Sequence, residues 1–311
     1  MKNNTKLRDN IQLSLAWLAA GLTIFVCLGI IIFLFIKGYQ AINWEFLTTD
    51  PKPTFKAEEA GGILAPIAGT FIVTIISIMI ALPWALATAI YLSEYASKNF
   101  VTAYFKLAVD VLSGVPTIVI AIFGVAIFTL PSLGFLSSMV EGVEGVQKAF
   151  GKSFLVVSIG MAVMILPYVI KTCEEAIKAV PQSYREASLA LGASKWHTIV
   201  DVVIPSASRG IVTAVVLGMG RIIGDTAIVW LLLGGTTRMT GMQPWWHVSN
   251  WLSTLKNTGA TLTTYIYFNS PAGEGNKAEL AFGASLVLIV IIIFLNAVTD
   301  MIGSRNKVKE E

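Results

Sequence analysis

The chain has 311 residues, of which 55% are hydrophobic and 13% are charged. Soluble globular proteins carry about 25% charged residues, so this sequence has too few charges to cover a water-soluble surface. Its net charge of +3 is too small to indicate a nucleic-acid-binding protein or a polybasic protein of the membrane surface. The apolar content also excludes intrinsic disorder. An integral membrane protein remains.

Cysteine and histidine are rare in this sequence. Cys27 and Cys173 lie far apart, so the sequence supports neither a disulfide framework nor a zinc cluster. His197 and His247 are equally isolated, and we expect no metal site. No Ser-His-Asp set or pair of carboxylates emerges from the sequence, so we expect no catalytic residue.

Six apolar segments are long enough for membrane helices, which need about 20 residues. They are residues 11–36, 63–92, 107–130, 153–170, 210–233 and 280–302. The first run is too long for the core of a signal peptide and is not followed by a small-residue cleavage site, so we expect it to be retained. The sequence therefore predicts an all-α membrane protein with six transmembrane helices within residues 11–303.

The Lys and Arg residues outside these segments indicate the orientation. If the N-terminus is cytoplasmic, most of them fall on the cytoplasmic side, as expected for membrane proteins. We therefore expect a multi-pass protein with residues 1–10 and 304–311 in the cytoplasm. In this orientation a coupling loop over about 171–209 is cytoplasmic, and a long loop over about 234–279 lies outside.

The predicted outer loop is rich in aromatic residues, which fit a belt at the membrane surface or a helix across the outer mouth. These residues are Trp245, Trp246, Trp251, Tyr265, Tyr267 and Phe268.

The predicted cytoplasmic connection over 171–209 is too charged to span a membrane, and its middle favours helix. Pro181 can open a helix, and Gly192 can close it in the left-handed conformation. A second helix can begin after Ser194 as its N-cap and run until Pro205 interrupts it. The sequence thus predicts a helix, a tight glycine turn and a second helix.

The same connection contains a spaced motif. Glu186, Ala187 and Ser188 are followed after three residues by Gly192, and an apolar pair precedes Pro205. This spacing resembles the signature of ABC-importer permeases, which is Glu-Ala-Ala, three residues, Gly, nine residues and Ile-x-Leu-Pro. The resemblance implies a type I importer fold in which this segment is a coupling helix on a separate ATPase subunit. The alternative is an ordinary amphipathic helical hairpin that stabilises a loop.

Further runs narrow the resemblance and extend it over nearly the whole chain. They include Ala-Ile-Tyr-Leu-Ser-Glu-Tyr at 89–95, Ser-Gly-Val-Pro-Thr at 113–117, Lys-Thr-Cys-Glu-Glu-Ala at 171–176 and Gly-Arg-Ile-Ile-Gly-Asp-Thr-Ala at 220–227. Together they resemble the PstA family, the A-type permeases of phosphate-uptake ABC importers. Gly218 and Gly220 also resemble the companion C-type permease, and a permease for another oxyanion is a further alternative.

The resemblance implies that the chain forms half of a transmembrane pathway for inorganic phosphate in a prokaryotic cell membrane. It implies three protein partners: a homologous C-type permease, a dimeric ATP-binding subunit and an extracytoplasmic phosphate-binding protein. ATP and Mg would bind to the ATPase, and we expect no cofactor in this chain and no nucleic-acid partner. A secondary transporter is a weaker alternative, because it would need its own ion-coupling residues and commonly an internal repeat.

Two opposite charges, Arg221 and Asp225, stand four residues apart in the fifth predicted span and would share one helical face. An ionised side chain in a membrane helix costs about 2.5 to 3.5 kcal/mol, so each should face a partner or a wet cavity. They can form a structural ion pair, or Arg221 can bind phosphate oxygens through its guanidinium fork while Asp225 tunes it. The resemblance favours the anion site. Lys171, at the inner end of the fourth span, is either a second pathway cation or a snorkelling anchor.

Overall fold

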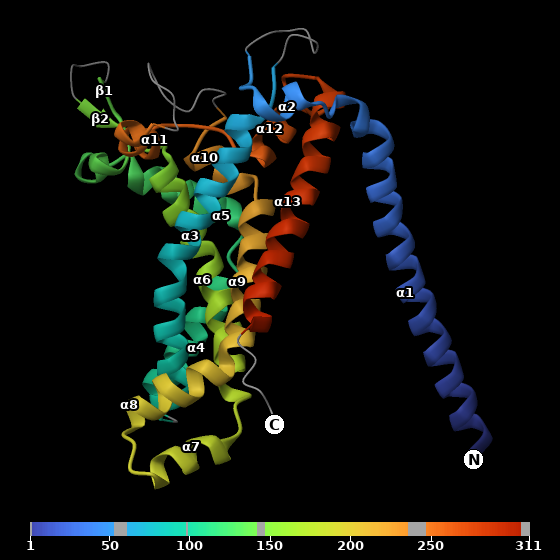
Figure 1. Ribbon diagram of the computed structural model, residues 1–311, viewed down its shortest axis with the longest axis vertical. Helices are drawn as coiled ribbons and strands as arrows, with labels where there is room; N and C mark the ends of the chain where they lie inside the picture. Colours follow the sequence, from blue (N-terminus) through green and yellow to red (C-terminus); the bar gives the residue numbers. More distant parts are fainter. Residues whose placement is uncertain (1, 53–60, 98, 142–146, 236–246, 306–311) are drawn as a thin grey trace.

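A computed structural model describes residues 2–52, 61–97, 99–141, 147–235 and 247–305 (Figure 1). Five of its helices contain segments long and apolar enough to cross a membrane, and a bent pair makes six if it forms one span. The five are α1 (Lys2–Gly38), α3 (Leu64–Ile90), α6 (Phe154–Lys178), α9 (Ile204–Gly224) and α13 (Ala278–Arg305). The predicted all-α membrane architecture is confirmed.

The third predicted span is a bent pair of helices. α4 (Phe100–Ser113) and α5 (Thr117–Phe128) meet at an angle of 98°. Gly114 ends α4, and Pro116 precedes α5 with an extended ψ of 137°. Proline has no N–H to donate and disfavours helical geometry at the residue before it, so the helix cannot continue through this segment. The segment predicted as the third span, residues 107–130, therefore contains parts of two helices that meet at a sharp bend.

The core of the bundle is α6, which packs against α3 and α9 along its length. Phe154, Met161 and Ile165 of α6 are fully buried. The fourth span was predicted to end at residue 170, where charged residues begin with Lys171. In the structure α6 continues to Lys178, because packing against α3 and α9 stabilises the helix. α10 (Ala227–Leu232) packs against α5 and α6.

A second apolar cluster forms around α13, which contacts α1, α9 and α12 (Leu262–Asn269). α1 approaches α13 at Gly38, whose backbone lies against that of Phe282, and the rings of Phe33 and Phe282 are 5.6 Å apart. The rest of α1 leans away from the bundle (Figure 1), and the apolar part of this helix is exposed.

The two ends of the bundle differ. One end carries α7 (Gln182–Ala190) and α8 (Lys195–Thr198), and the first residues of α1 and the last residues of α13 point toward it (Figure 1). The other end carries the hairpin of β1 (Met139–Glu141) and β2 (Gln147–Ala149), together with α2 (Trp44–Thr48), α11 (Trp251–Lys256) and α12. Short 3₁₀ helices connect these elements: η1 (Tyr39–Ala41), η4 (Pro131–Leu136) and η6 (Val248–Asn250).

The predicted outer loop over 234–279 thus contains two short helices, α11 and α12. Trp251 and Tyr267 are exposed, as a belt requires, whereas Tyr265 is buried against α13, so the belt prediction is wrong for Tyr265. Trp245 and Trp246 lie outside the described residues.

Candidate functional site

α7 and α8 form the predicted helical hairpin. α7 follows Pro181, which is its N-cap residue with a ψ of 140°. Gly192 has a φ of +85°, in the left-handed region where glycine is favoured. The Ser194 hydroxyl accepts a hydrogen bond from the N–H of His197 and so caps α8. The glycine turn and the serine cap are therefore confirmed.

The predicted interruption at Pro205 is wrong. The chain is helical from Lys195 to Gly224, through α8, the π-helical turn η5 (Ile199–Val203) and α9. Pro205 lies in the first turn of α9. Because proline lacks an N–H and crowds the preceding turn, an α-helix cannot pass it without a change in hydrogen bonding. The wider π turn directly before Pro205 provides that change.

The motif residues fall into an exposed group and a tethered one. Glu186 and Ala187 are exposed on α7. The hydroxyl of Ser188 lies 2.9 Å from that of buried Thr198, which ties α7 to α8. A methyl group added at Gly192 would meet no atom within 4 Å, so the requirement for glycine there is conformational. α7 thus presents an acidic side chain and a small residue on an open surface.

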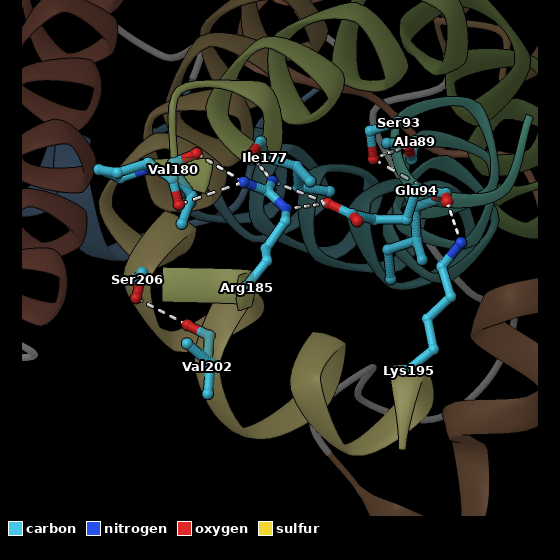
Figure 2. A network of polar contacts seen from close by, with 11 residues as sticks. Ala89, Ser93, Glu94, Ile177, Val180, Arg185, Lys195, Val202 and Ser206 are labelled. Carbon is cyan, nitrogen blue, oxygen red and sulfur yellow. Dashed lines mark hydrogen bonds and ion pairs between the residues drawn. The ribbon is translucent and has the colours of Figure 1, made fainter. Parts of the chain in front are cut away.

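A polar network that the sequence did not predict joins this hairpin to the bundle (Figure 2). Nη2 and Nε of Arg185 donate to Oε1 of Glu94 at 2.7 and 3.0 Å. The same guanidinium donates to the carbonyl oxygens of Ile177 and Val180 at 2.9 and 2.6 Å. Arg185 therefore connects α7 both to the last turn of α6 and to Glu94, in the π-helical turn η3 (Tyr91–Tyr95) that ends α3.

The other arm of the hairpin reaches the same place. Nζ of Lys195 donates to the backbone carbonyl of Glu94 at 2.5 Å and lies 4.5 Å from the ring centroid of Tyr95. A side chain in α7 and a side chain in α8 thus converge on Glu94. No sequence signal pairs these residues, because Arg185 and Glu94 are 91 positions apart.

A cleft of about 720 Å³ lies between the hairpin and the end of the bundle, lined by residues of η3, α6, α7 and α8. Its cations already have partners. Arg185 and Lys195 bind Glu94, and Nζ of Lys178 lies 2.5 Å from Oε1 of Glu174. Among the described residues that line the cleft, every cation therefore has a partner within the protein, so none of them is left to bind an anion.

Arg221 and Asp225 do not form the structural ion pair, which was the alternative to an anion site. α9 ends at Gly224, and Asp225 is extended with a ψ of 130°. Its Oδ1 accepts a hydrogen bond from the N–H of Ile228 at 2.8 Å, which caps the start of α10. The prediction of one helix over 210–233 is wrong, because an aspartate that caps a new helix breaks the old one.

Arg221 is exposed near the end of α9 and points toward α6. Its Nε donates to the sulfur of Met164 at 3.1 Å, and its Cζ lies 6.0 Å from the ring centroid of Tyr168. Among the described residues, no carboxylate is within ion-pair distance of Arg221. The structural ion pair with Asp225 is therefore excluded, and the anion site stays a prediction.

Lys171 follows Tyr168 by three residues on α6 and pairs with α4. Its Nζ lies 2.7 Å from Oδ1 of Asp110 and 3.4 Å from the hydroxyl of Ser113. Both ionic side chains are exposed, 41% for Lys171 and 60% for Asp110. Exposed ion pairs contribute about 0.2–1 kcal/mol to the stability of the fold. This contact therefore does not show that Lys171 has a structural role.

The structure describes no group of three or more His, Cys, Asp or Glu residues that could hold a metal ion. This finding covers only the described part of the chain.

Comparison with known proteins identifies the family. The family described as "Binding-protein-dependent transport system inner membrane component" matches residues 81–308. The chain is 29% identical over 305 residues to the probable ABC transporter permease protein YqgI of Bacillus subtilis, covering 97% of both. It is 34% identical over 243 residues to the phosphate transport system permease protein PstA 1 of Mycobacterium tuberculosis, covering 78% of this chain and 71% of the relative.

Solved structures show the same fold. A bacterial alginate ABC transporter, in complex with an alginate-bound periplasmic protein, aligns with a TM-score of 0.58 at 17% identity, covering 92% of this chain and 95% of the other. An inward-facing MetNI methionine ABC transporter aligns with a TM-score of 0.54 at 16% identity, covering 79% and 94%. With its spanning helices and its family match over residues 81–308, the chain belongs to the binding-protein-dependent transport system inner membrane component family and is a permease subunit of an ABC importer.

Proposed function

We propose that this permease is the A-type subunit of an ATP-driven importer of inorganic phosphate. Relatives named as phosphate permeases PstA support this assignment at 31–34% identity over most of the chain. The YqgI and YqgH relatives carry no substrate in their names. The choice of phosphate therefore depends on the chemistry of the pathway.

The observation that carries the proposal is the state of Arg221. The guanidinium is exposed, faces α6 and has no carboxylate partner in the described chain. Arginine stays protonated at all relevant pH values, and its planar fork matches two oxygens of a tetrahedral oxyanion. One arginine, in place of a cluster of uncompensated cations, also keeps the affinity low enough for the ion to leave, as transport requires.

From the sequence we expected Asp225 to tune Arg221, but in this proposal it has a structural role. Because its carboxylate is held by the N–H of Ile228, it shapes the break between α9 and α10 and does not neutralise Arg221. Lys171 would act as a second cation along α6, where phosphate would compete with Asp110 for its ammonium group.

ATP would drive the cycle from outside this chain. The exposed face of α7, with Glu186 and Ala187, would dock in a groove of a dimeric ATP-binding subunit on the cytoplasmic side, where ATP and Mg would bind. Closure of that dimer would move the helices as rigid bodies. Both termini would then be cytoplasmic, since the first described residues of α1 and the last of α13 point toward the end that carries α7 (Figure 1).

The proposal includes two further partners: a C-type permease would form the other half of the pathway, and an extracytoplasmic phosphate-binding protein would deliver the ion to the opposite end. The chain itself would need no cofactor and would bind no nucleic acid. The competing assignments are the companion C-type subunit, which Gly218 and Gly220 before Arg221 also resemble, and a permease for another oxyanion.

Reconstitution tests the proposal. The permease is incorporated into vesicles with the ATPase and the companion permease, and the binding protein is added outside. We expect ATP-dependent uptake of labelled phosphate and little uptake of labelled sulfate. Uptake without ATP, or uptake that prefers sulfate, would overturn the assignment.

A further inference from the structure

α7 has an unusual attachment for a helix expected to transmit force. None of its residues is buried, and its larger apolar side chains, Tyr184 and Leu189, are 49% and 48% exposed. Apolar packing therefore contributes little to holding α7 in place. Within the described chain, the side-chain hydrogen bonds that join α7 to α6 and to the turn after α3 come from Arg185.

We propose that the ion pair of Arg185 with Glu94 is a positioning contact that transmits movement of α7 to α3 and α6. The proposal rests on the docking role of α7 given above. In this proposal neither residue binds the transported ion or the nucleotide, and both act through the helices that they connect.

The burial of the pair supports this role. The side chains of Arg185 and Glu94 are only 13% and 10% exposed, unlike the other cytoplasmic-end ion pairs, in which one or both side chains are at least 44% exposed. An ion pair shielded from water is weakened little by salt and has few alternative geometries. If Glu94 were lost, the guanidinium would be left partly buried without a counter-charge.

The elements that Arg185 joins are those of the core. Glu94 lies in η3, the turn that follows α3, and the carbonyls of Ile177 and Val180 lie at the end of α6 and just beyond it. α3 and α6 pack against each other along the buried cluster of the bundle. A displacement of α7 would therefore reach two packed helices together, at their shared end.

The same connection leads to the pathway residue. α6 carries Met164 and Tyr168, which contact Arg221 of α9. A continuous set of contacts thus runs from α7 through Arg185 and α6 to Arg221. Lys195 adds a second link from α8 to the carbonyl of Glu94, so the two helices of the hairpin move with one point on α3.

Pulsed electron paramagnetic resonance on the assembled transporter tests this inference directly. Spin labels are placed at Ser183→Cys on α7 and Ser97→Cys after η3, both exposed positions. The background carries Cys27→Ser and Cys173→Ala, so that only these two cysteines react. The distance between the labels is measured without nucleotide and with ATP bound, and phosphate uptake per ATP hydrolysed is measured on the same preparations.

If the contact transmits movement, the label distance stays the same in both nucleotide states when Arg185 is present. In Arg185→Gln, the distance changes on ATP binding or its distribution broadens, and phosphate moved per ATP falls about fivefold or more, although ATP hydrolysis persists. A role in folding alone would reduce the amount of assembled transporter without changing the distance on ATP binding.

Lys178→Gln is the matched control. It removes a cytoplasmic ion pair of similar length, but that pair joins Lys178 to Glu174 within α6 and therefore connects no two helices. We expect native distances and native coupling in this variant.

Two outcomes would overturn the inference. One is an Arg185→Gln transporter with unchanged distance and unchanged phosphate per ATP. The other concerns Arg185→Lys, which is measured if the Gln variant does not assemble. A single ammonium nitrogen cannot take the separate places of Nε, Nη1 and Nη2, so fully native coupling would contradict the role. A failure of the native complex to bind the ATPase or to import phosphate would instead refute the proposed function.

Discussion

Arg221 donates through Nε to the sulfur of Met164 at 3.1 Å, across the contact between α9 and α6. A thioether is a weak acceptor, and within the described residues Nη1 and Nη2 of Arg221 form no hydrogen bond. The orientation of the side chain is thus fixed by a soft contact while the two terminal nitrogens stay available. This arrangement suits a group that must bind and release an anion.

Arg221→Gln is expected to reduce phosphate uptake by about 100-fold or more, because two charge-assisted hydrogen bonds of about 1.5–3 kcal/mol each would be lost. The amount of assembled transporter should not change, since Arg221 is exposed and supports no ion pair in the described chain. Uptake of labelled phosphate in vesicles checks the first point and size-exclusion chromatography the second.

Arg221→Lys is the matched control. It keeps the positive charge and loses the planar fork, so we expect uptake between that of the native and Gln variants. Native uptake in Arg221→Gln would remove Arg221 from the mechanism.

Asp225→Ala should destabilise the permease by about 0.5–2 kcal/mol, the usual cost of losing an N-terminal helix cap. Asp225→Asn should be close to native in both melting temperature and phosphate uptake, because an amide oxygen can still accept from the N–H of Ile228. Thermal unfolding in detergent and vesicle uptake are the measurements. If the Asn variant lost uptake while keeping its stability, the charge of Asp225 would act on Arg221 after all.

The comparison of sequence and structure separates local signals from distant ones. Gly192 and Ser194 were predictable because a left-handed turn and a helix cap depend on residues within one or two turns. The break at Asp225 was also local, but the apolar residues around it satisfied the pattern of a continuous span. Because hydropathy is averaged over a window of residues, a single capping residue inside a long apolar segment changes the average too little to reveal a helix break.

The contact between Arg185 and Glu94 depends on residues that are distant in the sequence. It joins elements 91 residues apart, and its geometry depends on where the ends of α3 and α6 meet. A sequence without aligned relatives contains no pairing signal for it. In the sequence, Glu94 is only part of a run that resembles a family, whereas in the structure the packing of α3 and α6 places it beside Arg185.

Lys171→Gln is expected to lower phosphate uptake by about tenfold, the effect of losing one charge-assisted hydrogen bond of about 1.5 kcal/mol. The matched variant is Asp110→Asn, which removes the same exposed ion pair but keeps the cation. We expect Asp110→Asn to retain uptake, because the pair itself contributes about 0.2–1 kcal/mol to stability. Equal losses in both variants would make Lys171 an anchor and not a pathway cation.

Glu186→Gln should weaken the binding of the ATPase subunit and leave the fold intact. The side chain is exposed, and no ion pair to it occurs in the part of the chain that is described. Replacing this side chain should therefore affect the binding of a partner and not the fold. Thermal unfolding of the isolated permease should be unchanged, while the ATPase concentration needed for half-maximal assembly should rise. Unchanged assembly would argue against docking through this face of α7.

Gly192 offers a test in which only the backbone is altered. A side chain added there meets no atom within 4 Å, but the φ of +85° costs an L-residue about 1–2 kcal/mol. Gly192→Val should distort the turn between α7 and α8 and lower the phosphate moved per ATP hydrolysed. Gly192→Asn should be much closer to native, because asparagine tolerates the left-handed region better than other non-glycine residues. Equal effects of the two variants would show that the turn acts through a contact with a partner, because backbone strain alone would separate them.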